Sequence, residues 1–309
     1  MRGLSCAMAV ISAALAMSAA ALGAEAQVVP PDAGNAFRCE RTEKGVRLVR
    51  DGRVVWNLDV DTPEGKPALH PLTLPSGRVF TDFHPEDHYW HLGFWFSFKY
   101  LNGVNYWEPV DRRNRGVAAA GETRVVERRI SCKGAAAEVE LGIEYGPRGS
   151  GRVDLSERRT MSFSAPSADG GYRISIVHEF VAHGDVAIDR TPPFKDKLGN
   201  WQRGYAGWTL RIPGELAEEF EVSGTEGRKS PREICGEERR HVDFSSRVNG
   251  EGVKFSVLES PEDSTRFYLW ADKRSVNPSP VFLSPKTLKD GERLRLAYEL
   301  EVHAARRRN

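Results

Sequence analysis

The two-residue alternation of apolar and polar side chains constrains the fold of this sequence more than any other feature. In the segment RLRLAYELEVH, close to the C-terminus, alternate positions are apolar (Leu294, Leu296, Tyr298, Leu300 and Val302). Successive side chains of a β-strand point to opposite faces, so a strand with this pattern buries one face and exposes the other. The pattern recurs in segments such as YRISIVHEFVA and GVKFSVLE. The chain is therefore predicted to be β-rich along most of its length.

Turn signals separate these alternating runs at short intervals. Asp51-Gly52 divides GVRLVR from RVVWNLDV, and a second pair of runs turns near Lys133-Gly134. Asp-Gly suits a two-residue hairpin loop because both positions tolerate a positive φ. A third pair is separated by SAPSADGG, and amphipathic helical windows are scarce. Many strands joined by short turns predict an all-β fold, a large antiparallel β-sandwich.

The first 26 residues are interpreted as a secretory signal peptide. Arg2 precedes a small-apolar run, and Ala24-Glu25-Ala26 forms an A-x-A cleavage pattern. We expect residues 27–36 to be a flexible lead-in and residues 37–305 to form a single domain. An uncleaved membrane anchor is the alternative for the first segment. No later run reaches the roughly 20 apolar residues of a spanning helix, so we expect an exported protein, periplasmic or extracellular, with no membrane contact after cleavage.

Charge and cysteine content exclude several classes of protein. The net charge is +1, which gives no reason to expect nucleic acid as a partner. The three cysteines after the signal segment (Cys39, Cys132 and Cys235) contain no C-x-x-C pair, so at most one disulfide forms, and three free thiols are the alternative. Zinc-protease helices, nucleophile elbows and dinucleotide fingerprints are absent from the sequence.

The segment DFHPEDHYWHLGFWFSFKYLNGVNYW contains three of the eight histidines of the chain. We interpret HPEDHYWHLG as a loop that leads into the strand GFWFSF, and a loop can turn the imidazoles of His88 and His91 toward one point. Two histidines near a carboxylate supply a general acid and a general base at neutral pH. The same groups also suit a divalent metal.

The candidate site follows from this cluster. The predicted catalytic residues are His88, His91, His70, Asp87 and Glu179. Asp87 is expected to fix an imidazole tautomer by accepting its N–H. The predicted substrate-binding residues are Arg211, Trp90, Trp107 and Glu108. Four other histidines (His178, His183, His241 and His303) are interpreted as hydrogen-bonding residues, with His178 either in the core or lining a pocket.

Three motifs in this region resemble the PmoA-like family, also catalogued as domain of unknown function 6807. KPALHPL (66–72) resembles its K/R-P-x-x-H-P-L motif. DHYWHLGF (87–94) resembles its D-H-x-x-H-x-G-L segment, with Phe94 in place of the leucine, and NGVNYW (102–107) its N-G-x-x-F-W segment, with Tyr106 in place of the phenylalanine. GYAGWTLRIP, with Gly207 and Arg211, and the C-terminal strand extend the likeness over most of the chain. Trp90 and Leu92 stand where relatives commonly carry a histidine and an arginine.

The resemblance implies a carbohydrate-processing protein. Exported members of the family often look like such proteins, and their length and paired histidines resemble the galactose-mutarotase-like supersandwich, where histidines and a carboxylate line a sugar groove. We carry over neither methane oxidation nor copper, because a membrane methane oxygenase needs several spanning helices.

These observations lead to one leading hypothesis and two rivals. The first is a sugar-processing enzyme of hydrolase, lyase or epimerase type, with a carbohydrate or glycoside as its small-molecule partner and no cofactor. The second is a non-catalytic carbohydrate-binding module that uses the same aromatic residues. The third is a metal-dependent protein in which His70, His88, His91 and a carboxylate hold a divalent ion.

Overall fold

A computed structural model describes residues 37–110, 119–224, 227–238, 240–261 and 264–304. The predicted signal peptide (1–26) and lead-in (27–36) lie outside the described residues. Neither helix within the described ranges is long and apolar enough to cross a membrane.

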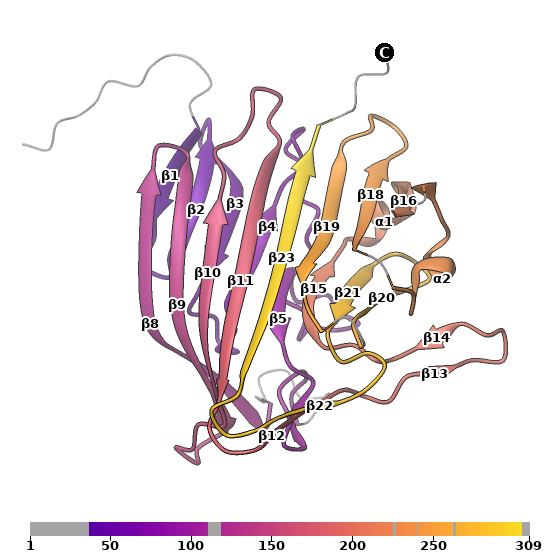
Figure 1. Ribbon diagram of the computed structural model, residues 1–309. Coiled ribbons are helices and arrows are strands. Elements are labelled where there is room, and N and C mark those ends of the chain that lie inside the picture. Colours follow the sequence, from indigo (N-terminus) through magenta and orange to yellow (C-terminus); the bar gives the residue numbers. More distant parts are fainter. Residues whose placement is uncertain (1–36, 111–118, 225–226, 239, 262–263, 305–309) are drawn as a thin grey trace, which may run out of the picture. The chain divides into compact units, whose positions relative to one another are not determined.

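Two large antiparallel sheets form the fold (Figure 1). The eight strands of the first sheet are, in spatial order, β1 (Phe37–Arg41), β2 (Gly45–Arg50), β3 (Arg53–Asp59), β4 (Ala68–Leu72), β5 (Phe94–Ser97), β15 (Gly207–Arg211), β21 (Ser275–Ser279) and β20 (Arg266–Leu269). The nine strands of the second sheet are β17 (Gly227–Arg228), β16 (Phe220–Gly224), β18 (His241–Ser246), β19 (Gly252–Glu259), β23 (Arg293–His303), β11 (Tyr172–Ala182), β10 (Leu155–Phe163), β9 (Ala136–Pro147) and β8 (Gly121–Lys133).

Smaller elements complete the described structure. A four-stranded sheet consists of β22 (Lys286–Leu288), β12 (Val186–Asp189), β6 (Tyr100–Leu101) and β7 (Val104–Asn105). A two-stranded hairpin pairs β13 (Phe194–Lys195) with β14 (Trp201–Gln202). The helices are α1 (Gly214–Glu219) and α2 (Pro231–Ile234).

The main core lies between the two large sheets. The predicted apolar positions of β23 are all buried, and their polar neighbours are mostly exposed or half-buried. Aromatic rings from both sheets meet in this layer: Phe96 of β5 lies 4.5 Å from the His178 ring of β11, and Trp56 of β3 stacks on Phe163 of β10 at 4.4 Å. The predicted all-β class and large antiparallel sandwich are confirmed, and sheets of eight and nine strands agree with the expected supersandwich architecture.

The hairpins lie where the turn signals predicted them. Arg50 pairs with Arg53 across a loop in which Asp51 and Gly52 have φ values of 50° and 74°. Both values are in the left-handed region that a two-residue turn of this kind requires. Lys133 likewise pairs with Ala136 at the β8–β9 turn.

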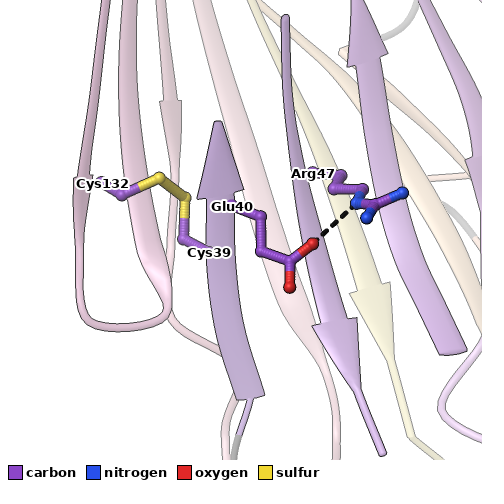
Figure 2. The surroundings of a disulfide bond; sticks show 4 residues. All are labelled: Cys39, Glu40, Arg47 and Cys132. Carbon is purple, nitrogen blue, oxygen red and sulfur yellow. Dashed lines mark hydrogen bonds and ion pairs between the residues drawn. A yellow bond between two sulfur atoms is a disulfide. The ribbon is translucent and has the colours of Figure 1, made fainter. Parts of the chain in front are cut away.

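One disulfide joins the two sheets. Cys39 of β1 is bonded to Cys132 of β8, and Figure 2 shows the bridge beside the ion pair of Glu40 with Arg47. β1 and β8 are the terminal strands of their sheets, so the bond links two edges of the sandwich. Cys235 is a buried free thiol. The structure therefore matches the one-disulfide alternative that the sequence left open.

A buried polar network lies within the core. His178 Nδ1 is 2.7 Å from Glu157 Oε1, its Nε2 accepts the indole N–H of Trp208 at 2.6 Å, and Arg159 donates to Glu157 at 2.6 Å. Burial lowers the pKa of His178 to about 4, although Glu157 opposes the shift. His178 is thus a hydrogen-bonded core residue, the first of the two alternatives for it.

Candidate functional site

The segment from Asp82 to Gly93 is a loop held on the end of β15. The backbone N–H of Asp82 donates to the carbonyl of Arg211 at 2.9 Å, and the N–H of Arg211 donates to the carbonyl of Gly93 at 2.8 Å. Gly93 itself donates to Asp82 at 3.1 Å, which closes the base of the loop. The loop is thereby fixed to a strand that follows it by more than 100 residues in the sequence.

Gly93 is required at the point where the loop enters β5. Its φ is +76°, and a Cβ atom there would lie 2.7 Å from the carbonyl oxygen of Leu69. A side chain would therefore be strained in its backbone conformation and would also collide with β4. This glycine allows the loop to pass close to the sheet.

Two successive turns inside the loop bring the imidazoles together. The N–H of His88 donates to the carbonyl of Pro85 at 3.1 Å, and the N–H of His91 donates to the carbonyl of His88 at 2.8 Å. As a result the ring centroids of His88 and His91 are 4.8 Å apart. The prediction that a loop directs these two side chains to one point is confirmed.

Both rings line a pocket of about 200 Å³, which we call the histidine pocket. It lies on the face of the first sheet that is turned away from the core, because Trp208 of β15 points into the main core and its neighbour Thr209 lines the pocket. The other lining residues are Trp90, Trp107, Glu108, Tyr205, Tyr268, Trp270, Ser275 and Asn277. Four of the predicted site residues thus share this pocket with His91: His88, Trp90, Trp107 and Glu108.

Trp270 is the aromatic residue that connects the histidines to the arginine behind them. Its ring lies 5.0 Å from that of His88 and 6.1 Å from that of His91, and the guanidinium of Arg211 lies 4.9 Å from its centroid. A cation over an indole face is attracted by the negative face of the ring. The contact with Arg211 therefore holds Trp270 in place as one wall of the pocket.

Asp87 links His88 to Arg211. Its carboxylate accepts the Nη2 of the almost fully buried Arg211 at 2.7 and 2.8 Å, and its Oδ2 lies 3.1 Å from Nδ1 of His88. Partial burial raises the pKa of Asp87, but the contacts with His88 and Arg211 outweigh it and bring the pKa below its usual value. Asp87 is therefore ionised at neutral pH and holds the His88 ring in place.

His91 is in a different electrostatic environment. Its side chain is buried, and burial lowers its pKa well below the usual value, with a further contribution from His88, Arg211 and Lys66. Its Nδ1 has no hydrogen-bond partner among the described residues. His91 is therefore a neutral imidazole at physiological pH.

Glu108 also lines the pocket, and its negative charge is balanced by a neighbouring ammonium group. It is buried and paired with the ammonium group of the equally buried Lys99. Close by, the Lys66 ammonium donates to the carbonyl of Trp107 at 2.9 Å, and burial lowers the pKa of Lys66 to about 8 against the opposing charges of Glu64 and Glu108. These buried, charge-paired groups lie beneath the wall formed by Trp107.

Comparison with known proteins identifies the family. The model of a family of unknown function (DUF6807) matches residues 45–308. The chain belongs to this family. Its description names no function, and no curated protein matches the sequence of this DUF6807 member.

The solved structures that are similar to this chain include the following three. They are a galactose 1-epimerase from Lactobacillus acidophilus NCFM (TM-score 0.43, 9% identity, 88% of this chain and 100% of that chain covered), a polysaccharide lyase (0.36, 12%, 89% and 33%) and the galactosidase domain of an alpha-galactosidase-sucrose kinase (0.31, 10%, 86% and 40%).

His70 does not reach the histidine pocket of this DUF6807 protein, contrary to its predicted role as a third wall. Its Nδ1 lies 2.9 Å from the Thr81 hydroxyl, and its ring stacks on Phe83 at 5.1 Å. Burial, and to a smaller extent His84, lowers the pKa of His70 to about 4. His70 therefore contacts the base of the loop.

Glu179 is also far from its predicted place beside the imidazoles. It is exposed on β11, opposite to the buried His178, and its strand neighbours are Arg158 and Arg295. The alternation of β11 directs Glu179 away from the core, so its carboxylate faces solvent on the second sheet. The structure therefore separates Glu179 from the histidine pocket.

Six lining residues were missed by sequence reasoning: Tyr205, Thr209, Tyr268, Trp270, Ser275 and Asn277. They come from β15, β20, β21 and the segments that adjoin these strands, more than 90 residues beyond the histidines. Asn277 bonds the carbonyl of Trp208 at 2.6 Å and the hydroxyl of Thr209 at 2.8 Å. The only local signal was the aromatic density of RFYLW, which strand propensity explains equally well.

A metal site of the kind considered from the sequence would need three ligands close together. Within the described ranges, no group of three or more His, Cys, Asp or Glu side chains is arranged to hold a metal ion. His70 stands apart from the His88–His91 pair, and Asp87 is already bound to Arg211.

Proposed function

We propose that this DUF6807 protein binds a carbohydrate in the histidine pocket. The imidazoles of His88 and His91 then transfer protons from and to the bound carbohydrate. The observation that carries the proposal is the meeting of these two rings, 4.8 Å apart, in a pocket walled by indole and phenol rings. Indole and phenol side chains offer an apolar face for a sugar ring and an N–H or O–H for its hydroxyls.

The two imidazoles have different surroundings. The carboxylate of Asp87, 3.1 Å from Nδ1 of His88, accepts the N–H at that position, which leaves Nε2 of the ring to accept a proton from a bound sugar. Burial keeps His91 neutral through its lowered pKa. Nε2 of His88 can take up a proton from the sugar as the base, and the imidazolium that forms can return this proton to the sugar at another position, directly or through the neighbouring His91 ring.

The carboxylates favour proton transfer over hydrolysis. Typical glycoside hydrolases use two carboxylates that flank the scissile bond. Among the described residues that line the pocket, Glu108 is the sole carboxylate, and it is paired with Lys99. We therefore place the reaction in the epimerase or lyase class.

A non-catalytic carbohydrate-binding module is the second candidate, and the five aromatic side chains of the pocket (Trp90, Trp107, Tyr205, Tyr268 and Trp270) favour it equally. Calorimetric binding of a sugar that is recovered unchanged after long incubation would support this candidate. If the protein is such a module, His88→Ala changes its affinity for the sugar, and neither the wild-type protein nor the variant forms a product.

The proposal is tested by incubating the protein with a panel of neutral and acidic oligosaccharides and analysing the products. His88→Ala and His91→Ala are expected to lower the turnover rate about 10²- to 10⁴-fold, the usual contribution of a positioned acid or base. His183→Ala is the matched control, since its ring bonds the Ser156 hydroxyl at 2.9 Å and lies outside the pocket. Wild-type rates in both pocket variants would contradict the assignment.

Export and metal independence are parts of the same proposal. The Cys39–Cys132 disulfide supports export, because such bonds persist in oxidising compartments. Residues 1–26 would act as the signal peptide that directs this export. Elemental analysis of the protein purified without a histidine tag checks the second part: a stoichiometric transition metal would favour the metal-dependent alternative.

A further inference from the structure

A second hollow adjoins the histidine pocket across two shared aromatic side chains. It has a volume of about 430 Å³, and Tyr268 and Trp270 line both hollows. Its other walls include Trp201 and Gln202 of the β13–β14 hairpin and Arg232 of α2. Figure 1 shows this hairpin extending outward near α2 and β20. The two hollows are therefore neighbours that share one aromatic wall.

The far wall of the second hollow is held in place by specific packing. Trp201 makes an edge contact with Phe282 at 5.5 Å, and the Lys195 ammonium lies 5.0 Å from its ring centroid. A Cβ at Gly236 would lie 2.0 Å from Cδ1 of Trp201, so the absence of a side chain there makes room for the indole. Trp201 is thus a preorganised aromatic surface.

The polar groups beside Trp201 differ in their availability. Asp196 accepts the backbone N–H groups of Leu198 and Asn200, both at 2.9 Å, so its carboxylate stabilises the hairpin turn. Asp272 accepts Nε of Arg274 at 2.7 Å. Gln202 donates to Asp196 through Nε2 at 3.3 Å, which leaves its carbonyl oxygen as an acceptor. The hollow combines an aromatic face with amide and guanidinium groups, which is the chemistry that sugar hydroxyls require.

The volumes decide how large a substrate the surface can hold. The histidine pocket, at about 200 Å³, is smaller than the range of about 300–1,000 Å³ that encloses a drug-sized ligand. It is suited to a single sugar ring. With the second hollow of about 430 Å³, the combined space falls inside that range.

We infer that the second hollow is a binding subsite for the next sugar unit, so that the substrate is a saccharide of at least two units that runs from the histidines over Trp270 to Trp201. This inference rests on the proposed function. One unit lies beside His88 and His91, and the adjacent unit contacts the indole of Trp201 and bonds Gln202 and Arg232.

The test is calorimetric binding of glucose, galactose, mannose, glucuronic acid and galacturonic acid and of their α- and β-linked oligomers of two to four units. The wild-type protein is expected to bind the oligomers at least tenfold more tightly than the matching single sugar. Trp201→Ala is expected to weaken binding of the oligomers about tenfold and to leave the affinity for the single sugar unchanged. Leu198→Ala is the matched control, because this side chain of the same hairpin is 75% exposed and outside the hollow.

Arg232→Ala provides a second variant that does not disturb the packing of Trp201, since Arg232 is exposed. It is expected to weaken binding of the oligomers selectively in the same way. Equal wild-type affinity for single sugars and oligomers would overturn the subsite and leave the proposed function standing. Failure of the wild-type protein to bind any member of the series would contradict the proposed function and the inference together.

Discussion

The ion pair of Asp87 with Arg211 should stabilise the histidine loop by a measurable amount. The Arg211 side chain is 1% exposed and Asp87 is 39% exposed, and their two contacts measure 2.7 and 2.8 Å. Removing one partner of a fully buried pair costs about 3–5 kcal/mol. That value is too large here, because water reaches Asp87 and screens the pair.

Asp87→Asn removes the charge and keeps one neutral oxygen as an acceptor. Hydrogen bonds to charged groups contribute about 1.5–3 kcal/mol and neutral ones about 0.5–1.5 kcal/mol. The expected loss in the free energy of unfolding is therefore about 1–1.5 kcal/mol. With a urea dependence of about 2–3 kcal/mol/M, the unfolding midpoint should fall by roughly 0.5 M.

The pH dependence of this loss has a definite sign. The pKa of Asp87 is lowered in the folded protein, so its contribution is fully present above the unfolded value of about 4 and is lost as the pH falls through the folded value. Urea unfolding of wild type and variant at pH 7 and pH 3 measures this. Asp185→Asn, in the exposed pair with Lys289, is the control and should leave the midpoint unchanged. Equal shifts for the two variants would refute the reasoning.

Three further predictions concern the loop and the edges of the sandwich. Gly93→Ala should destabilise the protein and abolish turnover together, as measured by urea unfolding and product analysis, because a Cβ there meets the Leu69 carbonyl at 2.7 Å; wild-type stability would contradict this. The lowered pKa of His70 means that the unfolded chain binds its proton first, so the free energy of unfolding of the wild-type protein should fall as the pH falls from 6.5 to about 4. His70→Gln should make this fall smaller, and an unchanged slope would argue against the reasoning. Replacing Cys39 and Cys132 together by Ser should lower the free energy of unfolding by up to about 4.7 kcal/mol, the loop-closure value for a bridge across about 100 residues, and an unchanged urea midpoint would show that the bond contributes nothing.

Local patterns in the sequence determined much of the fold. The alternation along β23 predicted which side chains are buried, and Asp51-Gly52 predicted the β2–β3 hairpin. Both features depend on residues that are adjacent in the chain, so they need no knowledge of distant partners. The same holds for the loop that carries His88 and His91, because its turns are closed by its own backbone.

The assembled site depends on contacts between distant parts of the chain. Arg211 and Asp87 were each predicted as site residues, but their pairing across 124 positions follows from the course of β15 beside the loop. Trp270 reaches the pocket because β20 and β21 extend the first sheet next to β15. No periodicity in the sequence fixes that order of strands.

Glu179 illustrates a signal that the sequence did contain. In YRISIVHEFVA the apolar positions share one face with His178, so alternation alone places Glu179 on the opposite, exposed face. His70 is a different case, since its motif is close to the loop but its ring is held by Thr81 and Phe83. Proximity in sequence and residue type were not sufficient to place either side chain in the pocket.

The most direct test of the central claim is the imidazole nitrogen NMR spectrum of the ¹⁵N-labelled protein during titration with a saccharide that it binds. The account predicts that the ring signals of His88 and His91 shift with the same saturation curve as binding, and that those of His183 do not. Saturable binding that leaves both pocket histidines unchanged would contradict a carbohydrate site at this pocket.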